Sequence, residues 1–224
     1  MIVRVLFIFA VAYCAIVMLV YFGQRHLQYH PGRNTPGKPA DSHFASMQEL
    51  HVKTEDGLEL LAWFVPPKNK DGRIIVFYHG NAGNISGRTD KVRHFIDAGY
   101  GVYLCEYRGF GGNPGSISEE GFYKDARSAL KWLEANGYAK SQWVIYGESI
   151  GSRPAVKMAL EYKAKALILE GAFSGAVDVG KEMYPWLPVN YMLKDRYDNV
   201  SKIKSVKASL LMLHADEDQT VPYA

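Results

Sequence analysis

The stretch WVIYGESIGSRPAVKMALEY, residues 143–162, decides the fold. Its first four residues form an apolar run that predicts a short buried strand, and residues 154–162 predict a helix. Between them lies Gly147-Glu148-Ser149-Ile150-Gly151, a GxSxG motif. Such a motif makes a sharp strand-to-helix turn that holds its serine in a strained conformation, and its glycines let the strand and the helix approach. The stretch therefore predicts a nucleophilic Ser149; the alternative is an ordinary turn whose serine only caps the helix.

Strands and helices alternate on both sides of this motif. Two apolar runs at 49–54 and 58–65 are joined through Asp56-Gly57, which indicates an antiparallel hairpin at the start of the sheet. Further strands are expected at 73–78, 101–105, 143–146, 166–169 and 209–213, and helices near 87–98, 116–136 and 149–161. Ser116 and Glu119 have the spacing of a capping box at the start of the second helix. The alternation predicts an α/β fold, a mostly parallel sheet with helices on both faces and a site at the carboxyl ends of its strands.

Two more of the expected strands end in loops suited to chemistry. His79-Gly80-Asn81-Ala82-Gly83-Asn84 follows one strand directly, and its backbone N–H groups, with that of Ile150, could hold an oxyanion. The alternative is a Gly- and Asn-rich turn, and we expect His79 to be structural. The other loop, residues 214–222, is acidic and follows the last strand. A carboxylate later in the chain than the serine suits the order Ser…Asp…His of an α/β hydrolase.

Together these motifs resemble the α/β-hydrolase superfamily, and most of all its membrane-anchored esterase and lipase-type branch. The resemblance extends over nearly the whole chain and implies Ser149 as nucleophile, Asp218 as acid and an oxyanion hole from the amides of Asn81 and Ile150. It implies motif and structural support from His79, Gly80, Gly147 and Gly151. Glu106 and Ser152 stand where the family usually has Asp and often has Gly.

One departure from the family concerns the catalytic histidine, which the resemblance places after the acid. The seven histidines, 26, 30, 43, 51, 79, 94 and 214, all precede Asp218. We therefore expect a hydrolase domain over 47–224 that lacks the last strand and helix of the family, leaving residues 209–213 as an open edge. Three functions follow: a serine hydrolase acting on an ester, thioester or amide of a small acyl substrate, impaired unless His214 substitutes; an inert remnant; or a non-catalytic module that binds a ligand or partner.

The N-terminus predicts a membrane anchor. Residues 5–22 contain no charge and would form a helix about 27 Å long, against a hydrocarbon thickness of about 30 Å. A cleaved signal peptide is the rival, since Ala10-Val11-Ala12 could imitate a cleavage site, but the apolar run continues for ten residues beyond it. We expect a single-pass signal anchor over 1–26, with the bilayer as partner and the side of the domain unassigned, then a Pro- and Gly-containing linker over 27–46.

Composition excludes other classes of protein. The chain has 224 residues, with 26 Lys+Arg against 23 Asp+Glu and no dense basic run, so nucleic acid is not an expected partner. Its two cysteines, Cys14 and Cys105, form no metal-binding pattern and are expected to be buried thiols. No phosphate-loop or dinucleotide motif is present, and we expect no cofactor and no metal.

The aromatic segment Tyr184-Pro185-Trp186-Leu187-Pro188 falls between an expected strand and the acidic loop. The family similarly inserts a cap at this point. The segment predicts either an apolar wall of an acyl pocket or plain packing.

Overall fold

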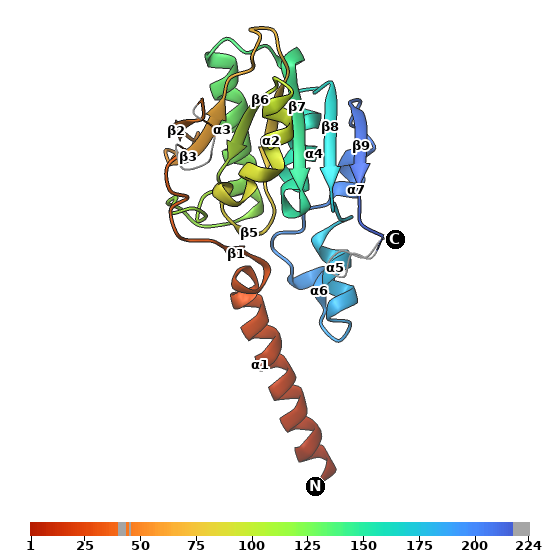
Figure 1. The fold of residues 1–224 in the computed structure, drawn as a ribbon. Helices are drawn as coiled ribbons and strands as arrows, with labels where there is room; N and C mark the ends of the chain where they lie inside the picture. Colours follow the sequence, from red (N-terminus) through yellow and green to blue (C-terminus); the bar gives the residue numbers. More distant parts are fainter. Residues whose placement is uncertain (40–43, 45, 217–224) are drawn as a thin grey trace.

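The computed structural model describes residues 1–39, 44 and 46–216. At its centre lies a seven-stranded sheet with the order β2-β3-β6-β4-β7-β8-β9 (Figure 1). These strands are β2 Gln48–Lys53, β3 Glu59–Val65, β4 Ile74–Tyr78, β6 Gly101–Cys105, β7 Trp143–Glu148, β8 Ala166–Glu170 and β9 Ser209–Leu213. β2 and β3 form an antiparallel hairpin, β3 is antiparallel to β6, and all later neighbours are parallel. The predicted hairpin and mostly parallel sheet are confirmed.

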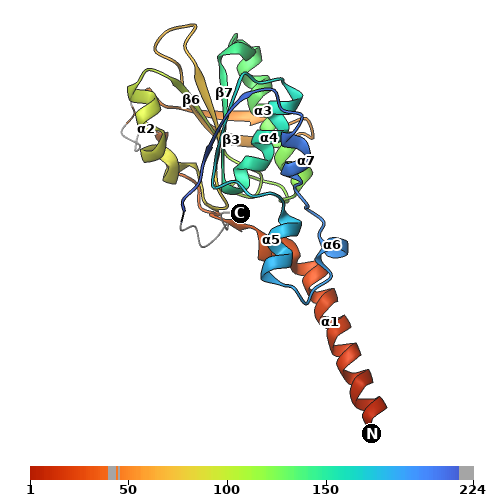
Figure 2. The ribbon, with the colours of Figure 1, turned by 90° about the vertical axis from the view of Figure 1, so that its right-hand side faces the viewer.

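Helices cover both faces of the sheet, as predicted. α2 (Thr89–Asp97), which follows the short 3-10 helix η2 (Ile85–Arg88), lies on one face, while α3 (Glu119–Ala135), α4 (Ser152–Glu161) and α7 (Asn199–Ile203) lie on the other (Figure 2). Another 3-10 turn, η3 (Lys140–Gln142), leads into β7. A separate cluster of buried apolar side chains lies on each face. Every residue of β4 and β6 is buried, because parallel strands covered on both faces have no side that meets water.

The cap of α3 differs from the prediction. Ser118, not Ser116, precedes the helix, and its side chain accepts a hydrogen bond from Gly121 N–H at 3.0 Å. Glu119, the expected capping-box partner, accepts instead from Tyr123 Oη and Tyr197 N–H. The capping-box spacing indicated the right region but the wrong serine, because Glu119 is the first residue of the helix and not its third.

The N-terminal helix α1 (Ile2–Gln28) projects from the domain (Figure 1). It is long and apolar enough to cross a bilayer, and its large apolar side chains are exposed along its length. Cys14, expected to be buried, is exposed on this helix, whereas Cys105 is buried in β6.

The segment after α1 was expected to be a spacer, yet its first residues pack on the domain. Tyr29 is 3% exposed, and its hydroxyl lies 2.5 Å from that of Tyr197. The two-residue strand β1 (His30–Pro31) pairs in parallel with β5 (Ala82–Gly83). The proline and glycine content indicated irregular backbone, but irregular backbone can still be packed against a core.

Candidate active site

Ser149 lies on the turn between β7 and α4, in the short 3-10 segment η4 (Ser149–Gly151). Its φ is +48°, one of three positive values among the described non-glycine residues. A non-glycine residue holds this conformation only where the surrounding structure enforces it. A Cβ on Gly147 would stand 2.6 Å from Gly151 O, and one on Gly151 would stand 2.0 Å from Tyr78 O. Both positions therefore require glycine, and the turn has the geometry that a nucleophile elbow needs.

The loop after β4 is held against this elbow. Gly80 N–H donates to Glu148 Oε2 at 3.0 Å, so the residue before the serine fixes the start of the loop. Glu148 also accepts from Arg88 Nε at 2.7 Å and Lys91 Nζ at 2.8 Å. Burial alone would raise the pKa of Glu148, but Lys91, Arg88 and the Gly80 amide together lower it below its usual value. Glu148 is therefore an ionised brace between the elbow and the loop.

The same ion cluster reaches the next strand. Lys91 Nζ also contacts both carboxylate oxygens of Glu170, at the end of β8, at 2.8 and 2.9 Å. Tyr146 Oη donates to Glu170 Oε2 at 2.5 Å. The ends of β7 and β8 are thus joined to α2 on one side of the elbow.

His79 is buried with both ring nitrogens engaged. Nε2 lies 2.8 Å from Glu106 Oε1 and Nδ1 lies 2.8 Å from Gly80 O. The other oxygen of Glu106 accepts from Ile85 N–H at 2.9 Å. With both nitrogens occupied, His79 has none free to serve as the base for Ser149, and its contacts are those of a structural residue.

Asn81 connects the loop to the N-terminal helix. Its Nδ2 donates to Gln28 O at 2.9 Å, and its Oδ1 accepts from His30 N–H at 3.2 Å. Within the described part of the chain, no residue accepts the backbone N–H of Asn81. Sequence reasoning chose Asn81 for its amide but missed this tie to α1, for which no motif exists.

The other predicted catalytic groups, the acid and the base, have no observed position beside Ser149. Asp218 lies outside the described residues, so the predicted acid has no position to report. Over residues 1–39, 44 and 46–216, no hydrogen bond joins the Ser149 hydroxyl to an imidazole. The structure therefore assembles an elbow and its adjoining loop without showing a base.

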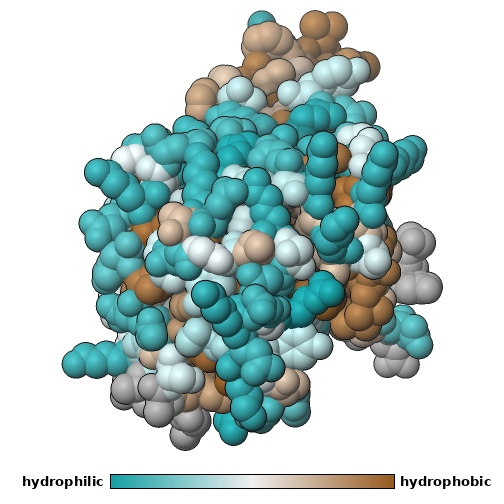
Figure 3. Space-filling view, turned by 90° about the horizontal axis from the view of Figure 1, so that it is seen from above, coloured by the Kyte–Doolittle hydropathy of each residue, from teal (hydrophilic) through white to brown (hydrophobic). Residues whose placement is uncertain are grey.

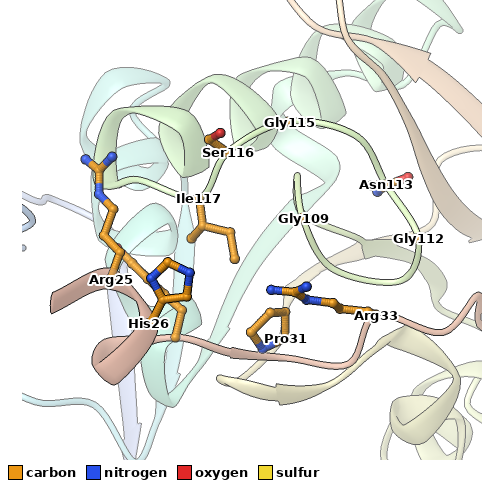
Figure 4. A pocket seen from close by; sticks show the side chains of 11 residues that line it. Arg25, His26, Pro31, Arg33, Gly109, Gly112, Asn113, Gly115, Ser116 and Ile117 are labelled. Carbon is orange, nitrogen blue, oxygen red and sulfur yellow. The ribbon is translucent and has the colours of Figure 1, made fainter. Parts of the chain in front are cut away.

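A cavity of about 560 Å³ lies between the end of α1 and the glycine-rich loop after β6 (Figure 4). Arg25, His26, Arg33 and Ile117 are among the residues that line it, and Ser149 is not. The cavity is thus a feature of the helix–domain junction rather than the pocket of the elbow.

A strained serine between a strand and a helix, in a mostly parallel sheet that opens with an antiparallel hairpin, defines an α/β hydrolase. The chain belongs to this class, since the family model described as "Serine aminopeptidase, S33" matches residues 69–196.

The chain is also similar to other proteins over most of its length, and it shares its fold with solved structures. The "Uncharacterized protein Rv2307c" of Mycobacterium tuberculosis is 35% identical over 96% of this chain and 77% of its own length. The "Alpha/beta hydrolase domain-containing protein WAV2" of Arabidopsis thaliana is 29% identical over 92% of this chain and 74% of its own. The Pyrococcus furiosus esterase Pf2001 shares the fold, with a TM-score of 0.68 and 19% identity over 87% of this chain and 79% of that one.

Proposed function

We propose that this protein is a membrane-tethered serine hydrolase that cleaves an ester, thioester or amide of a small acyl substrate through an acyl-enzyme on Ser149. The positive φ of Ser149, on a turn whose Gly151 packs against Tyr78 O, carries the proposal. A serine in this position is presented above the carboxyl edge of the sheet, where a substrate can reach it.

The proposed chemistry proceeds in two steps. Ser149 Oγ attacks the substrate carbonyl while a base takes the hydroxyl proton, and the N–H groups of Asn81 and Ile150 receive the oxyanion. The leaving group departs with that proton, and water then releases the acid from the acyl-enzyme. Asn81 suits its part because its side chain is tied to α1, while its N–H has no acceptor among the described residues.

The rate of turnover depends on the base that accepts the proton of the Ser149 hydroxyl. A serine is a weak nucleophile without a neighbouring base, and no histidine follows Asp218 within these 224 residues. In a comparable hydrolase, loss of the histidine costs on the order of 10⁶ in kcat and leaves about 10³ to 10⁴ over water. We therefore propose that Ser149 and Asp218 keep their family roles and that turnover depends on the base that serves Ser149.

The proposed membrane anchor is α1. Its apolar surface is exposed, and its C-terminal end belongs to the fold: Gln24 is 5% exposed and bonds Met192 O and Lys194 N–H. A helix whose last turns are built into the domain favours an uncleaved anchor over a signal peptide. Retention of the protein in the membrane pellet after alkaline extraction is the expected result.

Hydrolysis of p-nitrophenyl butyrate by the full chain in detergent tests the activity. We expect a rate above buffer that Ser149→Ala abolishes, because the proposed acyl-enzyme forms on Ser149. Ser141→Ala, an exposed serine before β7, is the matched control and should keep the wild-type rate. A Ser149→Ala variant as active as wild type would refute the acyl-enzyme, and no activity in either would favour a binding module.

A further inference from the structure

The segment Met183–Tyr191, which we call the arm, begins at the last residue of α5 (Ala176–Met183) and extends into α6 (Val189–Met192). Its sequence MYPWLPVNY contains no charged residue. Four of its large side chains are exposed: Met183 (62%), Tyr184 (45%), Trp186 (53%) and Tyr191 (89%). The sequence predicted that the 184–188 aromatics either form an apolar wall of an acyl pocket or pack. Tyr184 and Trp186, each about half exposed, are not packed in the core, and the pocket wall stays a prediction.

The arm runs alongside α1 (Figures 1 and 2). Tyr13 Oη donates to Trp186 O at 2.9 Å, and Gln24 Nε2 donates to Met192 O at 3.1 Å. Tyr13 and Gln24 are eleven residues apart in a continuous helix, so the contacts extend over about 16 Å of its length. The Trp186 carbonyl therefore lies within reach of the Tyr13 side chain, beside the uncharged run of residues 5–22.

This placement limits where the bilayer can be. If the arm lay in water, the Tyr13 hydroxyl would also be in water, and little more than residues 2–12 would remain for the membrane. Eleven residues span about 16 Å, roughly half of the hydrocarbon thickness of about 30 Å. If residues 5–22 span the bilayer, the Trp186 carbonyl, bonded to the Tyr13 hydroxyl, lies beside the spanning run and the arm is in contact with lipid. If α1 spans the bilayer, the arm is therefore also in contact with lipid.

Charged side chains near the arm lie where the uncharged run of α1 ends. Lys194 Nζ lies 4.3 Å from the ring centroid of Tyr21 and 5.7 Å from that of Phe22, where the apolar run ends. Arg25 pairs with Asp195 at 2.8 Å one turn further on. Aromatic rings with a lysine beside them are typical of the membrane–water interface. The face of the domain turned away from α1 is mainly hydrophilic (Figure 3).

The backbone of the arm suits the surface of a bilayer. Irregular backbone exposed to lipid does not occur within the hydrocarbon region, whereas the boundary between headgroups and acyl chains accepts apolar side chains on a partly paired backbone. Pro185 and Pro188 have no N–H, and four other arm residues donate theirs to nearby carbonyls: Tyr184, Leu187, Val189 and Tyr191. The Tyr13 hydroxyl and the Trp186 carbonyl, which lipid would leave unpaired, satisfy each other.

We propose that the arm is a second membrane contact, seated at the boundary between headgroups and acyl chains beside α1. The proposal rests on the tether of the proposed function. Its consequence is orientation, since the carboxyl ends of β7 and β8 point toward the α1 side of the domain (Figure 1), and β4 is parallel to β7. The elbow then opens toward the lipid surface, from which an acyl substrate can arrive.

Fluorescence quenching in vesicles tests the insertion. In a Cys14→Ala background, where buried Cys105 stays unreactive, the environment-sensitive dye NBD is attached at Tyr191→Cys or Met183→Cys in the arm. Leu19→Cys on α1 (74% exposed) is the positive control, and Asp71→Cys, in the exposed loop before β4, is the negative one. Each full-length chain is reconstituted in dioleoylphosphatidylcholine vesicles that contain acyl-chain spin-labelled lipid.

We expect the arm labels to be quenched as strongly as the Leu19 label, with blue-shifted emission, and the Asp71 label not at all. Quenching at Leu19 without quenching at either arm position would overturn the insertion and leave the tether intact. Absence of quenching at Leu19 would overturn both.

Discussion

Strands β7 and β9 belong to the same sheet, one strand apart, and have similarly apolar sequences. In β7, Trp143 and Ile145 are fully buried, whereas in β9 the four residues Leu210–Leu213 are 44–61% exposed. β7 has a strand on each side and helices over both faces, while β9 is bonded only to β8 among the described strands. An apolar run thus predicts a strand, but the strands and helices packed around that strand decide how deeply it is buried. The elbow follows β7, which is covered on all sides.

The largest effect is expected at the elbow itself. Gly151→Ala puts a Cβ 2.0 Å from Tyr78 O, a clash with backbone that no side-chain movement relieves. We expect a loss of more than about 4 kcal/mol in the free energy of unfolding, read from urea denaturation in detergent.

Gly87→Ala is the matched control, because nothing lies within 4 Å of the added Cβ. If both variants unfold at the same urea concentration, the elbow is not as tightly packed as described.

Two alanine substitutions compare the stability contributions of β7 and β9 directly. Ile145→Ala in β7 removes a fully buried side chain and should cost about 3 kcal/mol, whereas Leu211→Ala in β9, 50% exposed, should cost less than about 1 kcal/mol. The same denaturation experiment measures both. Equal costs would show that β9 is covered in solution and would remove the contrast between the strands.

Glu148→Gln tests whether Glu148 stabilises the elbow through its charge. The variant loses the ionised brace to Arg88, Lys91 and the Gly80 amide, at a cost of about 2 kcal/mol at pH 7. Because the folded-state pKa of Glu148 is lowered, its contribution is present above the unfolded pKa of about 4.3 and is lost as pH falls through the folded value. The difference from wild type should therefore shrink on acidification below about pH 4. A difference that stays constant with pH would mean that Glu148 does not act through its charge.

The smallest change in stability is expected from Leu211→Lys on the exposed edge. An apolar edge strand is a template for pairing between chains, and a lysine there opposes it. Stability should change by less than about 0.5 kcal/mol, while light scattering on warming should fall. Unchanged scattering would indicate that association uses another surface.

The sequence predicted the sheet, the hairpin and the elbow because alternating apolar runs and GxSxG are local patterns. It missed the contacts of Asn81 with Gln28 and His30, since the two-residue pair β1–β5 has no periodicity to detect. It also left the exposure of the arm undecided between wall and core. That exposure depends on α1 lying alongside, a contact between residues more than 160 positions apart. The role of Asp218 stays a prediction.

If Ser149 is a nucleophile, a fluorophosphonate forms a covalent adduct with its hydroxyl. The full chain in membranes is treated with the probe beside Ser149→Ala, and peptide mass spectrometry locates the adduct. We expect an adduct on the peptide that contains Ser149 and none in the variant. An adduct on another residue, or none on a folded chain of confirmed mass, would contradict this expectation.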